Sequence, residues 1–320
     1  MQIARGIENL PALDKSVVTV GVFDGVHLGH QAIMRLVRST ADDSRSLAVA
    51  VTFDRNPKEI LQPKYAPHYI NTLEQKLELI AWRRMDLALV LEFNHKLAEM
   101  SAEDFLIHIL LEKLKAETIV IGSNFAFGKG RRGRPALLRE MGEKLGFGTI
   151  VVPQIVMDGT IISSTEIRRL ISSGAVEKAA AMLGHPFVLR GTVVHGDGIG
   201  EKLGFPTANL QPAEKQILPA KGVYAASVRV GQTRYSAAVN IGTRPTVGGR
   251  SLTVEVYILD FSGNIYGEKL DVAFHQRLRS EIQFAVKEDL IKQIEADVVQ
   301  VQATEGSFCN MVFDTDCQLW

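Results

Sequence analysis

The amino-acid sequence predicts two domains: a parallel α/β sheet domain, then a small antiparallel β-barrel domain with a C-terminal helix. Three observations predict this fold class. The chain has 320 residues, which is about twice the usual length of a single domain. Hydrophobic residues make up 46% and charged residues 22% of it, as in globular proteins that bury a core. The apolar pattern also changes near Phe187, from alternating strands and helices to strands alone.

The first half of the chain alternates short β-branched segments with longer amphipathic segments. Strands are predicted at 16–23, 46–53, 87–93 and 117–122. Helices are predicted at 29–41, 72–85 and 101–114. Because a helix separates each strand from the next, the strands should form a parallel sheet with helices on both faces. Ligands of such sheets bind at the carboxyl ends of the strands.

Two short helices are predicted between the halves, at 164–173 and 175–183. A glycine ends each one, Gly174 and Gly184, and Pro186 follows the second, which is the usual way for a helix to stop. The domain boundary is therefore predicted here, and the first domain spans residues 1–185.

The second domain is predicted to be the barrel, because short alternating strands are separated by turn residues. These strands lie at 187–196, 222–231, 233–242, 252–261 and 269–278. A helix at 285–302 closes the domain, which spans residues 186–302. Residues 303–320 show no periodicity and are predicted to be a tail of unknown role.

Charge and cysteine content exclude several classes of protein. Lys plus Arg and Asp plus Glu are both 36, so no overall positive field favours nucleic acid or an anionic membrane. The two cysteines, Cys309 and Cys317, cannot build a disulfide framework or a four-ligand zinc site across the body of the chain. With no run of eighteen apolar residues either, we expect a cytoplasmic protein without membrane or nucleic-acid partners.

A glycine-rich turn, Gly21–His30, follows the first predicted strand and leads into a helix. Backbone amides at such a turn point towards a bound anion. His27 and His30 are three residues apart, so both can reach one phosphate, with support from the helix dipole. A tight turn with two exposed histidines fits the pattern equally well. A metal pair fits less well, because only Asp24 adds a ligand nearby.

Two further segments suit a polyphosphate. In the segment 159–168, Ser163 and Glu166 have the spacing of a capping box, so helix initiation alone explains both. A functional interpretation adds triphosphate contacts from the hydroxyl groups and from Arg168. The basic loop 122–134 is either a solvated surface loop or a site for a small polyphosphate, since a duplex would need a more extended positive face.

These three segments, with Thr52–Pro57, resemble the nucleotidylyltransferase superfamily and in particular its FMN adenylyltransferase branch. That branch has an HxGH turn, a GxxFxFG loop and an SSTxIR helix start. The resemblance implies a nucleotidylyltransferase-type sheet domain in which His27 and His30 are catalytic. The ATP-binding residues it implies are Gly21, Phe23, Asp24, Gly25, His27, His30, Asn124, Ser163, Ser164, Thr165 and Arg168.

The sequence departs from that branch at Arg55 and Asn56, where Pro and His are frequent, and at Arg134, where an acidic or amide residue is usual. These departures concern flavin contacts more than adenylyl transfer, and their effect is left open. The transfer itself needs no general base, because an FMN phosphate has a second pKa near 6 and is already a nucleophile at pH 7. The site therefore has to supply only charge stabilisation, by the histidines, by Arg168 and by a divalent ion.

In the second half, four glycines within 196–204 precede a segment that carries Pro206, Thr207 and Asn209. Glycines allow a close approach of the backbone to phosphates. Thr207 and Asn209 are two apart, so on a strand both face the same way and can offer oxygen atoms to one hard cation. A glycine-rich barrel loop that ends in a polar strand is the alternative.

Glu255 interrupts a predicted strand that is otherwise apolar. Burial of a carboxylate is unfavourable unless it is paired or catalytic. Glu255 is therefore either a satisfied ion in the core or a general base.

With Pro219–Ala225 and Asn240–Thr246, these residues resemble the riboflavin kinase family. The resemblance implies that Glu255 deprotonates the 5′-hydroxyl of the ribityl chain, and that Thr207 and Asn209 contact Mg²⁺ through the nucleotide. The ATP-binding and flavin-binding residues it implies are Gly196, Gly198, Gly200, Lys202, Gly204, Pro206, Thr207, Asn209, Asn240, Arg279 and Glu281.

The two halves in this order resemble the bacterial bifunctional riboflavin kinase/FMN adenylyltransferases. The resemblance implies conversion of riboflavin to FMN and of FMN to FAD, with ATP and Mg²⁺ used in both steps. Two alternatives stay open: a flavin-binding regulator without catalysis, and adenylyl transfer to another phosphate with the barrel as an accessory binder. The oligomeric state is not predicted.

Overall fold

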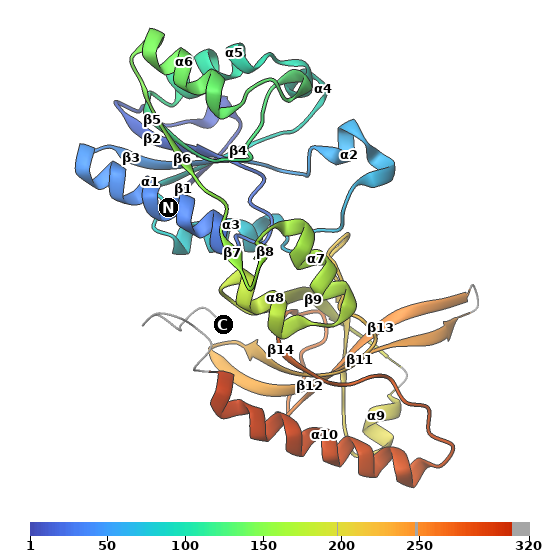
Figure 1. Ribbon diagram of the computed structural model, residues 1–320. Coiled ribbons are helices and arrows are strands. Elements are labelled where there is room, and N and C mark those ends of the chain that lie inside the picture. Colours follow the sequence, from blue (N-terminus) through green and yellow to red (C-terminus); the bar gives the residue numbers. More distant parts are fainter. Residues whose placement is uncertain (197, 247–248, 309–320) are drawn as a thin grey trace. The chain divides into compact units, whose positions relative to one another are not determined.

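The computed structural model describes residues 1–196, 198–246 and 249–308 (Figure 1). The chain divides into two compact units. Residues 1–68 and 73–163 form the first, which we call the sheet unit. Residues 69–72 and the chain from Ser164 onward form the second, which we call the barrel unit. Each is described by itself.

The sheet unit contains six parallel strands in the order β1-β4-β3-β2-β5-β6 (Figure 1). Their bounds are β1 Gln2–Arg5, β2 Ser16–Val20, β3 Leu47–Phe53, β4 Leu87–Leu91, β5 Ala116–Gly122 and β6 Gly148–Val152. The parallel sheet and its four central strands were predicted and are confirmed. The edge strands β1 and β6 were not predicted. Ala4 is the only buried residue in β1, and β6 has none, so neither has the apolar run of a central strand.

Helices cover both faces of this sheet, as predicted. Their bounds are α1 Leu28–Ser44, α2 Lys58–Leu61, α3 Leu73–Trp82, α4 His95–Glu99, α5 Ala102–Asp104 with its π-helical continuation Phe105–Lys113, and α6 Pro135–Leu145. Leu87 and Leu89 of β4 share a core with the π-helical segment, whereas Ala88 and Val90 pack against Leu77 of α3. This alternation follows from the period of two along a strand. A two-stranded hairpin, β7 Val156–Met157 and β8 Thr160–Ile161, completes the unit.

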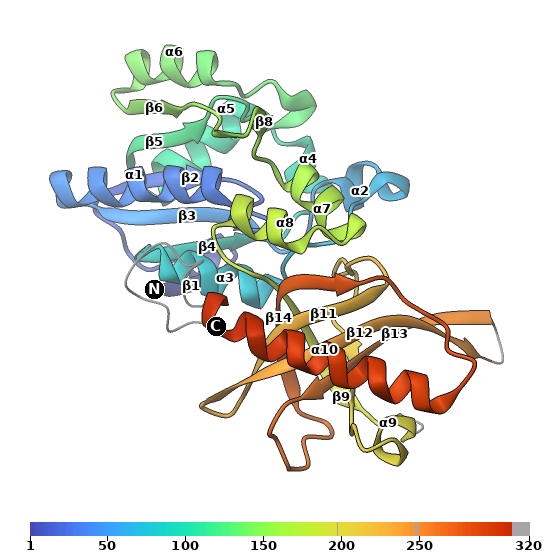
Figure 2. The same cartoon turned by 60° about the horizontal axis from the view of Figure 1, so that its bottom comes forward.

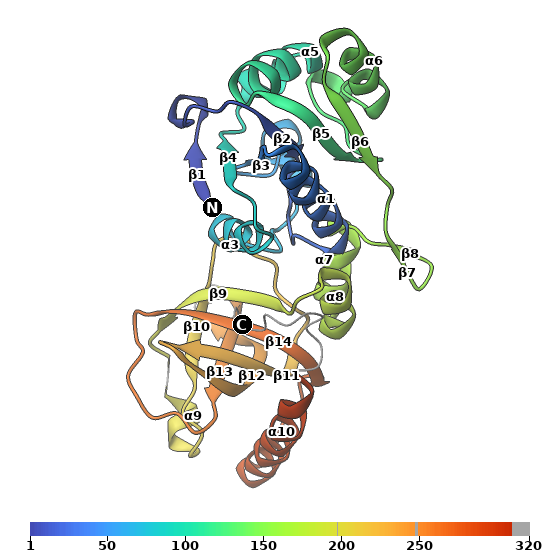
Figure 3. The ribbon, with the colours of Figure 1, turned by 90° about the vertical axis from the view of Figure 1, so that its left-hand side faces the viewer.

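The barrel unit contains a closed antiparallel barrel in the order β10-β13-β12-β11-β14-β9 (Figure 3). Its strands are β9 Phe187–Val194, β10 Ala208–Pro212, β11 Gly222–Val230, β12 Thr233–Thr246, β13 Gly249–Ile258 and β14 Lys269–Arg279. The predicted barrel is confirmed. Its helices are α7 Ser164–Ser173, α8 Val176–Leu183, α9 Ile199–Lys202 and α10 Lys287–Phe308.

Helix α10 crosses the outside of the barrel (Figure 2), where Val301 packs with Ala225 and Leu259. It continues to Phe308, so the predicted end at Gln302 is too early. The hydroxyl of Thr304 donates a hydrogen bond back to the carbonyl of Val301, which satisfies that hydroxyl inside a segment that has no apolar period of its own. The last residues of the chain, 309–320 with both cysteines, lie outside the described residues.

Gly174 and Gly184 follow α7 and α8 with φ angles of 82° and 73°, as the predicted stop signals require. Both helices belong to the compact barrel unit, although the sequence analysis assigns them to the first domain. The functional boundary between the domains stays a prediction.

Candidate functional site

The two histidines of the glycine-rich turn lie together at the carboxyl end of β2. His27 caps α1, and its Nδ1 atom accepts a hydrogen bond from the backbone N–H of His30 at 3.4 Å. The two imidazole rings stack with centroids 3.6 Å apart, and Phe23 packs edge-on against His30. His27 is only 6% exposed and His30 is half-buried. The alternative of two exposed histidines is therefore wrong.

The backbone of this turn is strained. Phe23 and Val26 have φ angles of 51° and 37°, which is rare for any residue with a side chain and exceptional for a β-branched one. Gln31 holds the far side of the turn, because its side-chain amide donates to the carbonyl of Val26 at 2.8 Å. A Cβ atom at Gly21 would lie 2.6 Å from the Phe23 ring, so the turn needs glycine there. Such strain is typical of functional sites.

Burial lowers the pKa of His30 well below its ordinary value of 6.5, and the neighbouring charges of His27 and Lys76 lower it further. His30 is therefore neutral near pH 7. Its Nδ1 atom is buried and has no hydrogen-bond partner. A buried nitrogen without a partner is unfavourable, and such a group in a folded protein is often found at a functional site.

Two of the departures from the adenylyltransferase pattern have structural roles at the end of β3. Arg55 forms an ion pair with the adjacent Asp54 at 2.8 Å, and Asp54 also accepts a hydrogen bond from the backbone N–H of Phe93. Asn56 is buried and accepts one from the N–H of Lys58 at the start of α2. Both residues thus stabilise this loop, whether or not they contact a flavin.

The basic loop after β5 is closed by its own backbone. Phe127 and Gly133 exchange two hydrogen bonds of 2.9 Å, and the rings of Phe125 and Phe127 stack with centroids 5.4 Å apart. Lys129 pairs with Glu99. The remaining predicted residues of the loop are exposed: Asn124, Arg131, Arg132 and Arg134. The loop therefore presents exposed cationic side chains on a backbone that its own hydrogen bonds hold in place.

The SSTxIR segment crosses the division between the units. Ser163 ends the sheet unit, whereas Ser164, Thr165 and Arg168 lie in α7 of the barrel unit. Joint binding of a triphosphate by these residues stays a prediction. Glu166, which fits a capping box, forms an ion pair with Arg169 at 2.6 Å.

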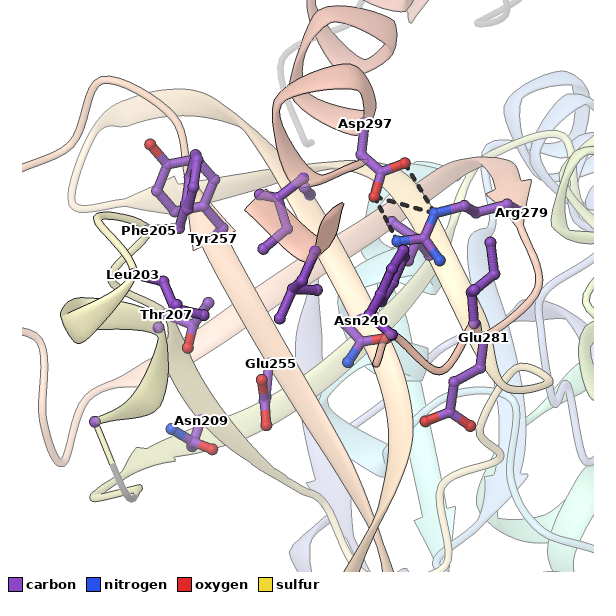
Figure 4. A pocket seen from close by; sticks show the side chains of 18 residues that line it. Leu203, Phe205, Thr207, Asn209, Asn240, Glu255, Tyr257, Arg279, Glu281 and Asp297 are labelled. Carbon is purple, nitrogen blue, oxygen red and sulfur yellow. Dashed lines mark hydrogen bonds and ion pairs between the residues drawn. The ribbon is translucent and has the colours of Figure 1, made fainter. Parts of the chain in front are cut away.

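A pocket on the outer face of the barrel gathers most of the predicted kinase residues (Figure 4). Glu255 on β13 is paired in register with Asn209 on β10 and with Asn240 on β12, and Figure 4 shows it between these two amides. Val254 and Val256 face the core. Since successive strand residues face opposite ways, Glu255 lies in the pocket, half-buried, and is not an ion in the core.

Helix α10 forms a second wall of the pocket, which the sequence analysis missed. Asp297 is 3% exposed and accepts hydrogen bonds from the Arg279 guanidinium, from Nε at 2.9 and 3.1 Å and from Nη2 at 2.7 Å. Gln293 donates a further one at 3.0 Å. The sequence offers one signal for Asp297. It is seven residues after Leu290 and three after Ile294, so it lies on the same helix face as these apolar residues, which also line the pocket. Arg279 is thus fixed by a buried ion pair rather than pointing freely into the pocket.

The glycine loop lies beside the pocket. A Cβ atom at Gly196 would lie 2.0 Å from the side chain of Asn209, and one at Gly200 would lie 2.4 Å from the carbonyl of Phe205. These two glycines therefore let the loop close onto β10. Gly198 and Gly204 have positive φ angles. Lys202 lies in α9, and its side chain is outside the described residues.

A second pocket begins on the other side of Thr207, which lines both. Its lining residues are mostly apolar or aromatic and include Pro206, Val256, Ile258, Phe261, Ile265 and Tyr266. The ring of Tyr266 stacks on His195 with centroids 3.9 Å apart. No motif in the sequence predicts this pocket, because its aromatic residues come from the connection between β13 and β14.

Family models match both units. The FAD synthetase model matches residues 10–166, and the riboflavin kinase model matches residues 183–304. Bifunctional riboflavin kinase/FMN adenylyltransferases are similar over nearly the whole chain. The one from Haemophilus influenzae is 36% identical, with 95% of this chain and 99% of that protein covered. The one from Pseudomonas fluorescens is 37% identical, with 95% and 97% covered.

A solved structure from Streptococcus pneumoniae, described as a macrolide-efflux protein, also matches this chain. Its TM-score is 0.86 at 30% identity, and the match covers 94% of this chain and 99% of that one. No helix in the described part of this chain is long and apolar enough to cross a membrane. The two family models and the full-length relatives agree, and this chain belongs to the family of bifunctional riboflavin kinase/FMN adenylyltransferases.

Proposed function

We propose that the barrel unit holds the riboflavin kinase reaction and the sheet unit the FMN adenylyltransferase reaction of this bifunctional enzyme. The observation that carries the kinase assignment is the position of Thr207 between two pockets. A phosphoryl donor and an acceptor bound in adjacent pockets can meet at the residue that the pockets share. Phosphoryl transfer depends mainly on such positioning.

Riboflavin fits the pocket that contains Glu255. Apolar side chains from the β14–α10 connection and from α10 line one part of it, among them Ile282, Phe284, Leu290 and Ile294. These suit the flat isoalloxazine ring. The polar row of Asn209, Glu255 and Asn240 suits the hydroxyl groups of the ribityl chain. ATP is then assigned to the second pocket, where Phe261 and Tyr266 offer aromatic surface to the base.

In the kinase reaction, the Glu255 carboxylate accepts the proton of the 5′-hydroxyl as that oxygen attacks the γ-phosphorus of ATP, and ADP leaves. Thr207 and Asn209 would hold Mg²⁺ together with the nucleotide, because a hydroxyl and an amide oxygen are hard donors. No cluster of three His, Cys, Asp or Glu that could hold a metal occurs in the described part of the chain. This suits a cation that takes its other ligands from phosphates and water, where it neutralises phosphate charge.

In the adenylyltransferase reaction, a phosphate oxygen of FMN attacks the α-phosphorus of ATP, and pyrophosphate leaves. The histidine turn stabilises the charge on the phosphates through His27, His30 and the N-terminus of α1. His30 is neutral in the free protein, and a polyphosphate beside it raises its pKa, so binding is expected to take up a proton.

Two incubations with purified protein test these assignments. Riboflavin, ATP and Mg²⁺ should give FMN and then FAD, and supplied FMN should give FAD without riboflavin, as resolved by chromatography. Parallel incubations with pantetheine phosphate and nicotinamide mononucleotide test the rival acceptors. Adenylylation of one of these in place of FMN would contradict the proposal, and flavin binding without any product would favour the regulator.

With only two cysteines in the chain, we also propose a cytoplasmic location without nucleic-acid partners.

A further inference from the structure

The sheet unit buries a lysine that no step above uses. Lys76 lies in α3 and is 7% exposed. Its Nζ atom donates hydrogen bonds to the carbonyl of Phe53 at 2.8 Å and to the carbonyl of Val22 at 3.2 Å. Phe53 is the last residue of β3, and Val22 follows β2 just before the strained turn. The ammonium group therefore ties together the carboxyl ends of two neighbouring strands.

The carbonyl of Val22 is one of two anchors of the histidine turn. It accepts a hydrogen bond from the hydroxyl of Thr52 at 3.2 Å as well as the one from Lys76. The other anchor is the carbonyl of Val26, which Gln31 holds. The residues with positive φ lie between these anchors. Because a strained backbone persists only where its surroundings hold it, side-chain donors on both sides of the turn account for its shape.

Two carboxylates and the imidazole of His30 interact with the amine. The Asp24 side chain, in the turn, is 3% exposed, and Asp54 lies at the end of β3, where Arg55 also pairs with it. His30 faces it from α1. Burial lowers the pKa of Lys76 to about 8, although the charges of Asp24 and Asp54 counteract part of the shift. The amine is therefore charged at neutral pH and loses its charge within an accessible pH range.

We propose that Lys76 is a positioning residue for adenylyl transfer, which holds the carbonyls of Val22 and Phe53 so that His27 and His30 keep their place in the strained turn. The inference rests on the assignment of adenylyl transfer to the sheet unit. Lys76 acts through the backbone and the two carboxylates, and it does not itself touch a phosphate.

The first test is Lys76→Met, which keeps the length of the side chain and removes its donors and charge. FAD formation from FMN should fall about 100-fold, the effect of a displacement of about 1 Å in a reacting group. Riboflavin phosphorylation in the same sample should not change. Removal of the amine leaves two backbone carbonyls without this donor and two carboxylates without its charge. The thermal midpoint should therefore fall, and both activities are compared at a temperature at which the variant is folded. The control Lys144→Met makes the same change at an exposed lysine of α6 and should alter nothing.

The second test is the pH dependence of FAD formation. This dependence should not change in Lys76→Met if Lys76 has a purely structural role. Above its pKa the neutral amine can still donate to the two carbonyls, but it no longer offsets the charges of Asp24 and Asp54. In the parent, kcat/KM for FAD formation should therefore decline above about pH 8 towards the level of Lys76→Met. Lys76→Met should lack this alkaline limb, while riboflavin phosphorylation gives the profile of the other site. If the variant forms FAD at the parental rate, or keeps the limb, the inference is wrong. If the parent forms no FAD at all, the assignment of adenylyl transfer fails instead.

Discussion

Replacement of Glu255 by glutamine separates a catalytic base from a structural carboxylate. Glu255 lies in the pocket between Asn209 and Asn240, so an amide of the same shape still meets hydrogen-bonding neighbours. Because the side chain is half-buried on the outer face of the barrel, the free energy of unfolding should change by less than about 1 kcal/mol. The variant loses only the ability to accept a proton.

The expected effect follows from the share of general-base catalysis. Riboflavin phosphorylation should fall by about 10² to 10⁴, which corresponds to about 2.7 to 5.4 kcal/mol in activation free energy at 1.36 kcal/mol per factor of ten. Adenylylation of supplied FMN should continue at the parental rate, because its nucleophile is already ionised. Both rates are measured by chromatography of FMN and FAD from one preparation, together with its thermal midpoint.

A matched control is Glu214→Gln, which makes the same change at an exposed residue and should leave both rates unchanged. Phosphorylation of riboflavin at the parental rate by Glu255→Gln would refute the assignment of the base. Loss of both activities with a lower thermal midpoint would instead show that Glu255 stabilises the barrel.

Three further predictions follow from the described contacts. The double variant with His27 and His30 replaced by alanine should lose FAD formation from FMN but keep FMN formation; an equal loss of both in a folded protein would contradict this. Asp297→Asn removes the carboxylate that holds Arg279, so KM for riboflavin should rise about tenfold. An unchanged KM would show that this ion pair only stabilises the packing of α10 on the barrel. Burial lowers the pKa of His275 from 6.5 to about 3. Between these two pH values, His275 therefore binds a proton in the unfolded chain but not in the folded one. Stability should therefore fall by about 1.4 kcal/mol per pH unit below pH 6.5, and denaturant titrations of His275→Gln should lack this component.

Local patterns in the sequence were enough to predict the fold class and the motifs. The central strands β2 and β4 are wholly buried and mostly apolar, and the predicted barrel strands are short alternating segments separated by turn residues. Hydrophobic periodicity was therefore enough to identify them. The two histidines could be placed together because a helix start fixes residues that are three apart. Glu255 stood out because a strand face can be counted from its neighbours.

Contacts between distant parts of the chain could be decided only by the tertiary structure. Lys76 meets carbonyls 54 and 23 residues away, and Arg279 meets Asp297, which is 18 residues away in α10. The edge strands β1 and β6 carry too few buried residues to be recognised by pattern. A sequence period reports which face of an element is apolar, but not which element covers that face. Burial of a charge and the pKa that results depend on that second fact. The groups around the strained turn and the α10 wall of the pocket at Glu255 could therefore be identified only in the folded chain.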